Sequence, residues 1–295
     1  MSALGRVGVV GVGRAGSCVI AALRAAKAAP RRVLVRDPVR AAAVRAWLAD
    51  SVAVDAAFGA GWRTLDTIVL AVPDRAIDSA AAALDAAGIG PGAVRLHLSG
   101  VQGAALCGPP PHGSCHPLAA LPDALASGEA AARAALAGAT CALDGDPVGM
   151  ARAAALAEAL GAVGVPVASE GRAHWHAAAA VVANDLVALL AIGERAAVAA
   201  GVERGVARAG LLHLARTAIA SVEAAGGDPA AGLTGAVARG DANTLRRHLD
   251  ALPIRDAAVH RTLSRILVDV AEAGGRLDGD AARAVRDVLE DDETP

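Results

Sequence analysis

The sequence predicts an α/β fold over residues 1–169, followed by an all-helical domain over residues 170–295. Up to residue 169, short apolar runs rich in Val, Ile and Leu alternate with alanine-rich stretches. This alternation is typical of a parallel sheet whose strands are joined by helices. After residue 169 the strand-like runs stop and alanine, the strongest helix former, dominates. A chain of 295 residues is also long enough for two cores.

Composition excludes several classes of function. A formal net charge of -2 at pH 7 offers no electrostatic basis for binding nucleic acid. The longest apolar stretch carries Asn184 and Asp185 at its centre, which favours a buried helix over a membrane span. No basic region precedes the first strand, which argues against a signal peptide. The cysteines lack C-x-x-C spacing, which is typical of reduced cytoplasmic thiols without a zinc site or disulfide frame; they are Cys18, Cys107, Cys115 and Cys141.

The first strand and helix enclose a glycine motif. Residues 6–10 (RVGVV) form a short apolar run, and Gly11, Gly13 and Gly16 then match G-x-G-x-x-G ahead of a helix-forming stretch. In this strand–turn–helix context the glycines allow close backbone approach to a pyrophosphate at the helix N-terminus. We therefore expect a Rossmann-type dinucleotide site; the alternative is a glycine-rich turn with no ligand.

The end of the second strand (RRVLVRDP) bears on the choice of cofactor. An acidic residue at this position binds the ribose of NAD, whereas an arginine accommodates the 2′-phosphate of NADP. Arg36 and Asp37 are adjacent here, so both cofactors stay open. Positive charge from Arg40 and from Arg14, which lies with Ala15 inside the glycine loop, favours NADP over NAD. The alternative for Arg14 and Arg40 is a solvated surface charge.

Later strands supply further candidates for the site. "LDTIVLAVPD" ends at Val72 and Pro73, and "AVRLHLSG" ends at Ser99. Because strand carboxyl ends line the crevice of a doubly wound sheet, these residues are expected beside the nicotinamide. His116, in "GSCHPLAAL", is expected in a loop at a strand end, as a candidate site residue. Its alternative is a histidine that bonds to local backbone.

Residues 171–201 predict one helix that is apolar almost all round and therefore buried on most sides. His176 and Asn184 share a face with Ala180, because steps of four residues stay roughly in register. We expect this face to meet a ligand across an interdomain cleft; a contact between helices is the alternative. His174 and His176 point apart on a helix, so no metal site is expected.

Further helices are expected over residues 203–226, 241–252, 254–275 and 278–291, and the last five residues are expected to be disordered. Between the first two of these lies the polar stretch "LTGAVARGDANTLRRHL", residues 233–249. Asp241 fits an N-cap for the helix that follows. Thr234 and Arg239 remain as candidate substrate contacts, unless Arg239 simply pairs with Asp241 to hold the turn.

Six motifs together resemble a known family: "GVGRAG", "AVPD", "LHLSG", "HPL", "WHAAAAVVANDLVAL" and "LTGAVARGDANTLRRHL". The chain resembles Rossmann-like proteins whose C-terminal half is domain of unknown function 2520. That family is similar to proteins with a 6-phosphogluconate-dehydrogenase-like helical domain, such as ketopantoate reductase and pyrroline-5-carboxylate reductase. The resemblance implies NADP, a site between the domains and a homodimer through the helical domain. Some members of the family act as ketopantoate reductases in pantothenate biosynthesis.

One departure from the wider set affects the chemistry. Related reductases use a lysine on the long interdomain helix, but the single lysine of this chain is Lys27, and the chain has no tyrosine. Another group must then protonate the developing alkoxide, and His176 is the best placed by sequence. A histidine side chain ordinarily titrates at about pH 6.5, which suits a general acid. Arg239 can hold a substrate carboxylate, while Asn184 and Thr234 can orient oxygen atoms.

Three functions follow as hypotheses. The first is an NADP-dependent oxidoreductase that reduces a small carboxylate-bearing carbonyl compound, with ketopantoate as the named substrate. The second is an imine reductase of the pyrroline-5-carboxylate type, which needs no strong acid because an imine protonates easily. The third is a non-catalytic NADP-binding sensor or scaffold, in which residues 233–249 form a dimer contact. Fold alone does not decide between them.

Overall fold

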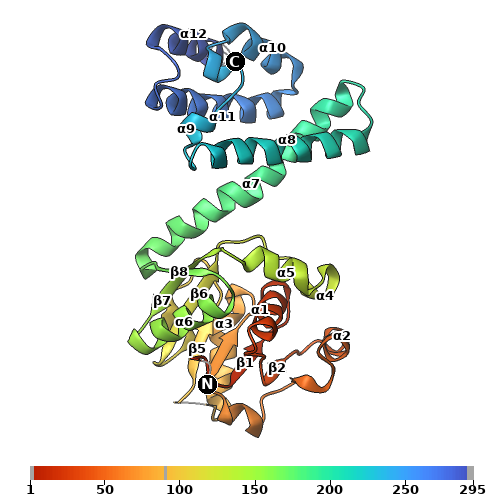
Figure 1. The fold of residues 1–295 in the computed structure, drawn as a ribbon, viewed down its shortest axis with the longest axis vertical. Helices are drawn as coiled ribbons and strands as arrows, with labels where there is room; N and C mark the ends of the chain where they lie inside the picture. The colour runs from red at the N-terminus through yellow and green to blue at the C-terminus, as the bar shows by residue number, and fades with distance from the viewer. Residues whose placement is uncertain (1–2, 90–91, 291–295) are drawn as a thin grey trace. The chain divides into compact units, whose positions relative to one another are not determined.

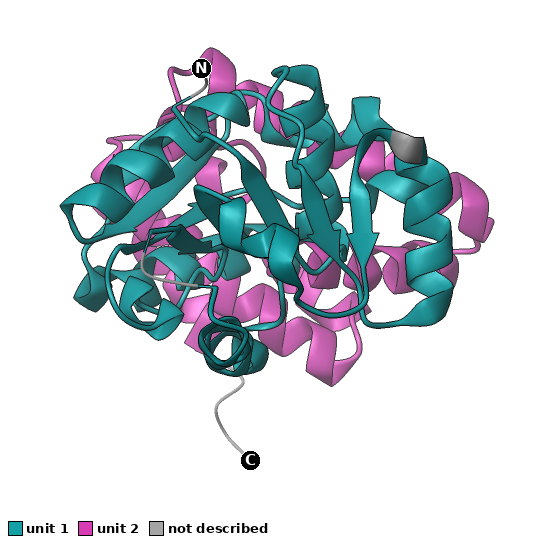
Figure 2. Ribbon diagram, turned by 90° about the horizontal axis from the view of Figure 1, so that it is seen from below, with its two compact units in different colours: residues 1–184 teal, residues 185–295 magenta. Residues whose placement is uncertain are grey.

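The computed structural model describes residues 3–89 and 92–290 of the chain. The chain divides into two compact units, residues 1–184 and 185–295 (Figure 2). This division lies inside the long helix α7, Arg172–Ala199, whereas the sequence predicts it after residue 169. The first turn of α7 bonds to the first unit through Arg172, which explains the later boundary. The tail expected to be disordered, residues 291–295, lies outside the described residues.

The first unit contains an eight-stranded sheet with the order β3-β2-β1-β4-β5-β6-β7-β8. Strands β1 to β6 run parallel, and the chain reverses its direction of growth between β1 and β4, as in a doubly wound Rossmann fold. The predicted fold class is confirmed, with one correction to the parallel sheet. β7 runs antiparallel to β6, and β8 follows β7. The reason is that the connection over residues 118–139, which carries α4 and α5, stays at the end of the sheet at which β6 ends, so β7 runs back beside β6. The strands are β1 Val7–Val10, β2 Arg32–Leu34, β3 Ala53–Asp55, β4 Thr67–Leu70, β5 Val94–His97, β6 His112–Pro117, β7 Thr140–Gly145 and β8 Val163–Pro166.

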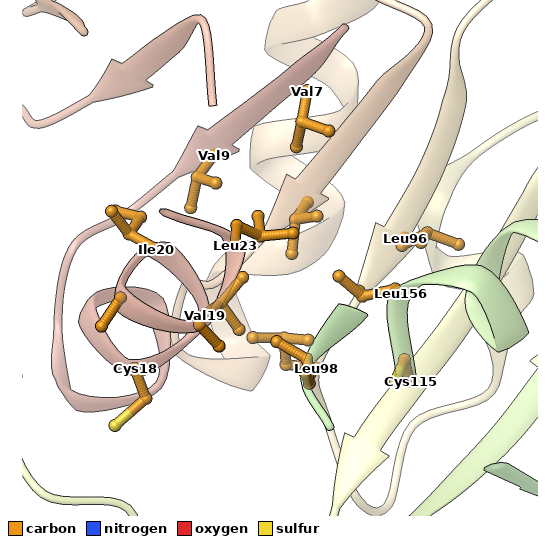
Figure 3. Packing of buried hydrophobic residues seen from close by; sticks show 14 of the residues in the cluster. Val7, Val9, Cys18, Val19, Ile20, Leu23, Leu96, Leu98, Cys115 and Leu156 are labelled. Atoms are coloured by element: carbon orange, nitrogen blue, oxygen red, sulfur yellow. The ribbon is translucent and has the colours of Figure 1, made fainter. Parts of the chain in front are cut away.

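Helices cover both faces of this sheet. Alternate strand residues face opposite sides, so Val9 of β1 joins one apolar cluster and Val10 the other. Figure 3 shows the first cluster, in which Val19 of α1 and Leu156 of α6 pack near the strands. In the second cluster, Leu84 of α3 lies against the other face. α5 packs along α1 (Figure 1). The helices of this part are α1 Arg14–Ala25, α2 Pro38–Leu48, α3 Ile77–Ala86, α4 Ala124–Ser127, α5 Glu129–Leu136 and α6 Pro147–Ala159.

After β8 the described chain holds helices and no further strand, which confirms the all-helical second half. A core forms between α10, α11 and α12, where Leu245, Val268 and Val285 are buried together. The helices are α7 Arg172–Ala199, α8 Arg204–Ala224, α9 Pro229–Gly232, α10 Ala242–Ala251, α11 Ile254–Ala273 and α12 Gly279–Glu290.

The prediction that α7 is buried on most sides is wrong for the single chain. Arg172 is its buried residue, whereas Val181, Val182 and Val187 are 61%, 72% and 65% exposed. By length and composition alone, Ser169–Ala199 is apolar enough to cross a membrane, with a mean hydropathy of 1.7. A helix that is apolar all round must pack against other apolar surface, but the pattern does not show which surface that is. Within each compact unit, the described residues leave these valines uncovered.

Candidate functional site

The glycine motif adopts the predicted strand–turn–helix geometry. Gly11 has φ +91°, and a Cβ there would lie 2.5 Å from the carbonyl oxygen of Ala71. A Cβ at Gly16 would collide with the carbonyl oxygen of Gly11, so Gly16 lets α1 pack close to the loop. Both glycines are therefore required by the protein's own backbone.

Gly13 differs from its neighbours because a Cβ there would meet no protein atom within 4 Å. It precedes α1, whose first turn carries no side-chain cap and no acidic residue. Unbonded N–H groups at a helix N-terminus attract an anion, and the open space at Gly13 allows close approach to them. These residues fit the pyrophosphate of a dinucleotide. Arg14 and Ala15 belong to the same first turn of α1.

A cavity of about 680 Å³ opens at the carboxyl ends of β1, β2 and β4, beside the topological switch point. Its walls are mostly apolar, as expected for a site that holds an adenosine or nicotinamide ring. Six residues predicted for cofactor binding line this cavity: Gly11, Gly13, Arg36, Asp37, Val72 and Pro73.

The charged side chains at the end of β2 have different roles. The Asp37 carboxylate caps α2 by accepting a hydrogen bond from the Arg40 N–H at 2.6 Å. The Arg40 Nε donates to the carbonyl oxygen of Val12 at 2.8 Å, and its Nη2 donates to Asp123 at 2.8 Å. Within residues 3–89 and 92–290, exposed Arg36 makes no hydrogen bond or ion pair and stays available to a phosphate.

His116 and His176 meet in the first unit. Their ring centroids lie 5.6 Å apart, with an interplanar angle of 78°. The prediction that His116 lies in a loop is wrong, because it is part of β6 and pairs there with Ala142 of β7. The alternative of a bond to local backbone is also not observed at Nδ1, which is buried without a partner. His176 is exposed on α7 and therefore accessible to a ligand.

Gly100 makes this pairing possible. A Cβ at Gly100 would collide with Nδ1 of His176 and would lie 2.7 Å from Nε2 of His116. The residue follows β5, and the carboxyl ends of β5 and β6 lie at the same edge of the sheet as those of β1 and β4. The turn after β5 thus presents a bare backbone to two imidazole rings.

The buried His116 is uncharged at neutral pH. Burial lowers its pKa to about 4, and the positive charges of His176 and Arg172 act in the same direction. A neutral imidazole has one donor and one acceptor nitrogen. His116 can therefore hold a hydrogen bond next to His176 without competing with it for a proton.

Ser99 is used inside the turn that follows β5. It is 5% exposed, and its hydroxyl donates to Oδ2 of Asp74 at 2.8 Å. The Ser99 hydroxyl oxygen in turn accepts from the N–H groups of Val101 and Gln102. Its predicted contact with the cofactor stays a prediction.

The remaining candidates do not join the histidine pair within the first unit. Asn184 is exposed on α7, at the end of that unit. Thr234 and Arg239 are exposed residues of the second unit. Asp241 caps α10 as predicted: Oδ1 accepts from the Thr244 N–H at 3.0 Å and Oδ2 from Oγ1 at 2.6 Å. These bonds, and then the charge of Arg239, lower the pKa of Asp241.

Sequence reasoning missed Arg172 and the role of Gly100. Arg172 is fully buried, and its Nη2 donates to the carbonyl oxygen of Ser99. An arginine at the start of a helix usually lies at the surface, so no sequence pattern identifies Arg172 as buried. For Gly100 the position in the turn that follows a strand is a usable signal, because a bare backbone there allows close approach.

The fold and the glycine cradle define a Rossmann domain followed by a helical unit. Residues 139–266 match the family model described as Domain of unknown function (DUF2520), which confirms the predicted resemblance over that range. No match was found among curated proteins.

Solved structures share this fold over most of the chain. A protein from Thermotoga maritima is 20% identical with a TM-score of 0.69, covering 90% of this chain and 98% of its own. A proposed NADP oxidoreductase from Bacteroides fragilis is 18% identical with a TM-score of 0.68, covering 90% and 99%. Pyrroline carboxylate reductase from Plasmodium falciparum, solved with NADP bound, is 10% identical with a TM-score of 0.55, covering 95% and 98%. At these identities the similarity establishes the fold.

Proposed function

We propose that this protein is an NADP-dependent oxidoreductase that reduces a small carboxylate-bearing carbonyl compound. The observation that carries the proposal is the His116–His176 pair at the carboxyl edge of a sheet whose switch point holds a dinucleotide-sized cavity. Cofactor cradle and proton-transfer groups at one edge are what hydride chemistry requires. The proposed NADP oxidoreductase from Bacteroides fragilis, which shares the fold, is consistent with this assignment.

NADP is the proposed cofactor, with NAD possible in its place. One carboxylate oxygen of Asp37 accepts the hydrogen bond that caps α2, and the Arg40 side chain bonds to Val12 and Asp123. Arg36 is left to contact a 2′-phosphate, for which a guanidinium is well suited. When bound, the reduced nicotinamide supplies a hydride.

His176 is the proposed proton donor. Reduction of a carbonyl needs a proton at the oxygen as well as a hydride at the carbon. His176 is exposed, whereas His116 lies half-buried beside it and is uncharged. His116 then orients the His176 ring and the substrate oxygen. Ketopantoate is the named substrate; Arg239 remains the candidate contact for its carboxylate, and Asn184 and Thr234 remain candidate contacts for its oxygens.

An imine of the pyrroline-5-carboxylate type is the second candidate substrate. The fold shared with Plasmodium falciparum pyrroline carboxylate reductase favours it. An imine nitrogen is more basic than a carbonyl oxygen, so this reaction depends less on an acid from His176.

We further propose a cytoplasmic homodimer formed through the helical unit. In the second unit, α7 and α8 carry exposed apolar residues, among them Val187, Leu189 and Leu214, which are unfavourable in water. In the second unit these helices border an apolar cavity of about 810 Å³. A second copy of the chain offers the same apolar surface, and a two-fold interface is self-complementary. The four cysteines are free and buried, as expected of a reducing compartment.

Oxidation of NADPH by the purified protein tests the proposal. Ketopantoate and pyrroline-5-carboxylate are supplied separately, each with NADPH and with NADH. Turnover of ketopantoate with NADPH supports the first candidate, and turnover of the imine alone supports the second. Saturable NADPH binding without turnover of any carbonyl or imine would instead indicate the sensor or scaffold hypothesis.

A further inference from the structure

Arg172 is an unusual residue in the first turn of α7. It has a relative exposure of 0%, and its Nε and Nη1 atoms have no hydrogen-bond partner. Its Nη2 donates to the carbonyl oxygen of Ser99. Removing a guanidinium from water without pairing its N–H groups is costly, so the position is retained at the expense of stability. A residue held in this way invites a functional explanation.

Two carboxylates lie near Arg172, but both are occupied by other groups. Asp74 Oδ2 accepts from the Ser99 hydroxyl at 2.8 Å. Asp144 Oδ2 accepts from the Ala104 N–H at 3.0 Å and from the Ser169 hydroxyl at 2.9 Å. The charge of Arg172 is therefore balanced only at a distance. Its field extends to the neighbouring histidines.

The bond from Arg172 reaches the residue next to Gly100, and Gly100 in turn faces both imidazole rings. α7 also carries His176, one helical turn after Arg172, so a single helix start fixes both the turn and one ring. We propose that Arg172 is the positioning residue of the histidine pair: by bonding the Ser99 carbonyl oxygen, it fixes the Ser99–Gly100 turn against both rings. This role rests on the proposed function for its use in catalysis.

The groups that face His116 support this role. Burial lowers its pKa most, followed by the charges of His176 and Arg172, whereas Asp74 raises it and His97 lowers it slightly. His97 is itself kept neutral, with a pKa of about 4 that Arg172 also lowers. Asp144 raises the pKa of His97. Arg172 is thus the permanent cation beside the pair.

Histidine titration followed by NMR, on the full chain without substrate or cofactor, tests the role directly. In the unmodified protein, His116 is expected to remain neutral down to about pH 5, given its pKa of about 4. Arg172→Gln removes the charge but keeps an N–H donor for the Ser99 carbonyl. In this variant the titration midpoint of His116 is expected to rise by about one pH unit. An unchanged midpoint overturns the proposal.

Two further variants separate charge from packing. Arg172→Lys keeps a positive charge, so the His116 midpoint should stay near that of the unmodified protein; a rise of one unit contradicts the proposal even if Arg172→Gln does not fold. Arg95→Met removes another buried guanidinium of the same sheet, which bonds Ile89 and Cys107. It should leave the His116 midpoint unchanged, and an equal rise would also overturn the proposal. These titrations need no turnover, so they stand or fall separately from the proposed reaction.

Discussion

His116 and His176 face each other edge to face, with ring centroids 5.6 Å apart, although 60 residues of sequence separate them. One ring is held in the sheet and the other is carried by a helix that enters the second unit. The half-buried ring of His116 stays neutral, while the exposed ring of His176 remains open to a ligand. This asymmetry assigns the two histidines different roles.

Replacing His176 should affect catalysis and not cofactor binding. We expect His176→Ala to lower kcat for a carbonyl substrate by about 100-fold or more, since general acids contribute about 10²- to 10⁴-fold. The dissociation constant for NADPH should change little. His174→Ala is the matched control, because His174 is exposed on the same helix and two positions away. Equal losses in the two variants would contradict the assignment.

Gly100→Ala should disturb the histidine pair without unfolding the sheet. The added Cβ would lie 2.7 Å from Nε2 of His116 and closer still to His176, so at least one ring must move. We expect kcat to fall by about ten-fold or more, because catalysis is sensitive to small displacements. Gly210→Ala, at a position with open space in α8, serves as the control. Full activity in Gly100→Ala would show that the pairing is dispensable.

Arg36 should determine the preference for NADP. Loss of a charge-assisted contact with the 2′-phosphate removes about 1.5–3 kcal/mol, so Arg36→Ala should weaken NADPH binding by about ten-fold to a hundred-fold. Binding of NADH should be nearly unaffected. Arg31→Ala removes an exposed arginine at the start of the same strand region and should change neither constant. Calorimetric titration of both cofactors measures this, and equal weakening of NADPH and NADH would refute the role.

His97 and His116 should make the free energy of unfolding depend on pH. His97 and His116 have their pKa lowered from 6.5 to about 4, so below pH 6.5 the unfolded chain binds protons that the folded chain does not. Their contribution is complete above pH 6.5 and is lost as pH falls through about 4. The urea midpoint should therefore decrease between pH 7 and pH 4.5. His116→Gln should reduce the slope of the urea midpoint against pH. An identical slope in the variant would contradict a neutral His116 in the folded protein.

A charge on the exposed face of α7 should dissociate the proposed dimer. Val187 of the second unit is 65% exposed, and burial of an added arginine at an apolar interface is unfavourable. Val187→Arg should be a monomer by light scattering at concentrations where the unmodified chain is a dimer. Val148→Arg places the same charge at a 54% exposed position of α6 and should leave the dimer intact. A monomeric unmodified chain would end this proposal.

Local patterns predicted much of the fold correctly. The glycine motif identified the β1–α1 turn, and apolar periodicity identified α7 as one helix of 28 residues. Asp241 was correctly assigned as a helix cap because capping depends on neighbours in sequence. The antiparallel direction of β7 was missed, since strand direction follows from the path of the connection and not from the strand's own residues.

The site was harder to predict than the fold. His116 was assigned to a loop because a proline follows it, yet the strand continues to Pro117. Arg172 gave no signal, because its role comes from burial against residues about 70 positions earlier in the chain. The exposure of α7 also could not be foreseen, since an apolar pattern does not say whether its cover is intramolecular.

The proposed reduction, with His176 as proton donor, is tested by oxidation of NADPH in the presence of ketopantoate or pyrroline-5-carboxylate. The rate is measured with the unmodified protein and with His176→Ala. The unmodified protein is expected to turn over at least one of these substrates, with NADPH preferred over NADH. For a carbonyl substrate, kcat is expected to fall by about 100-fold or more in His176→Ala. Binding of NADPH without turnover of either substrate would contradict the proposed reaction. An unchanged rate of carbonyl reduction in His176→Ala would contradict the role of His176.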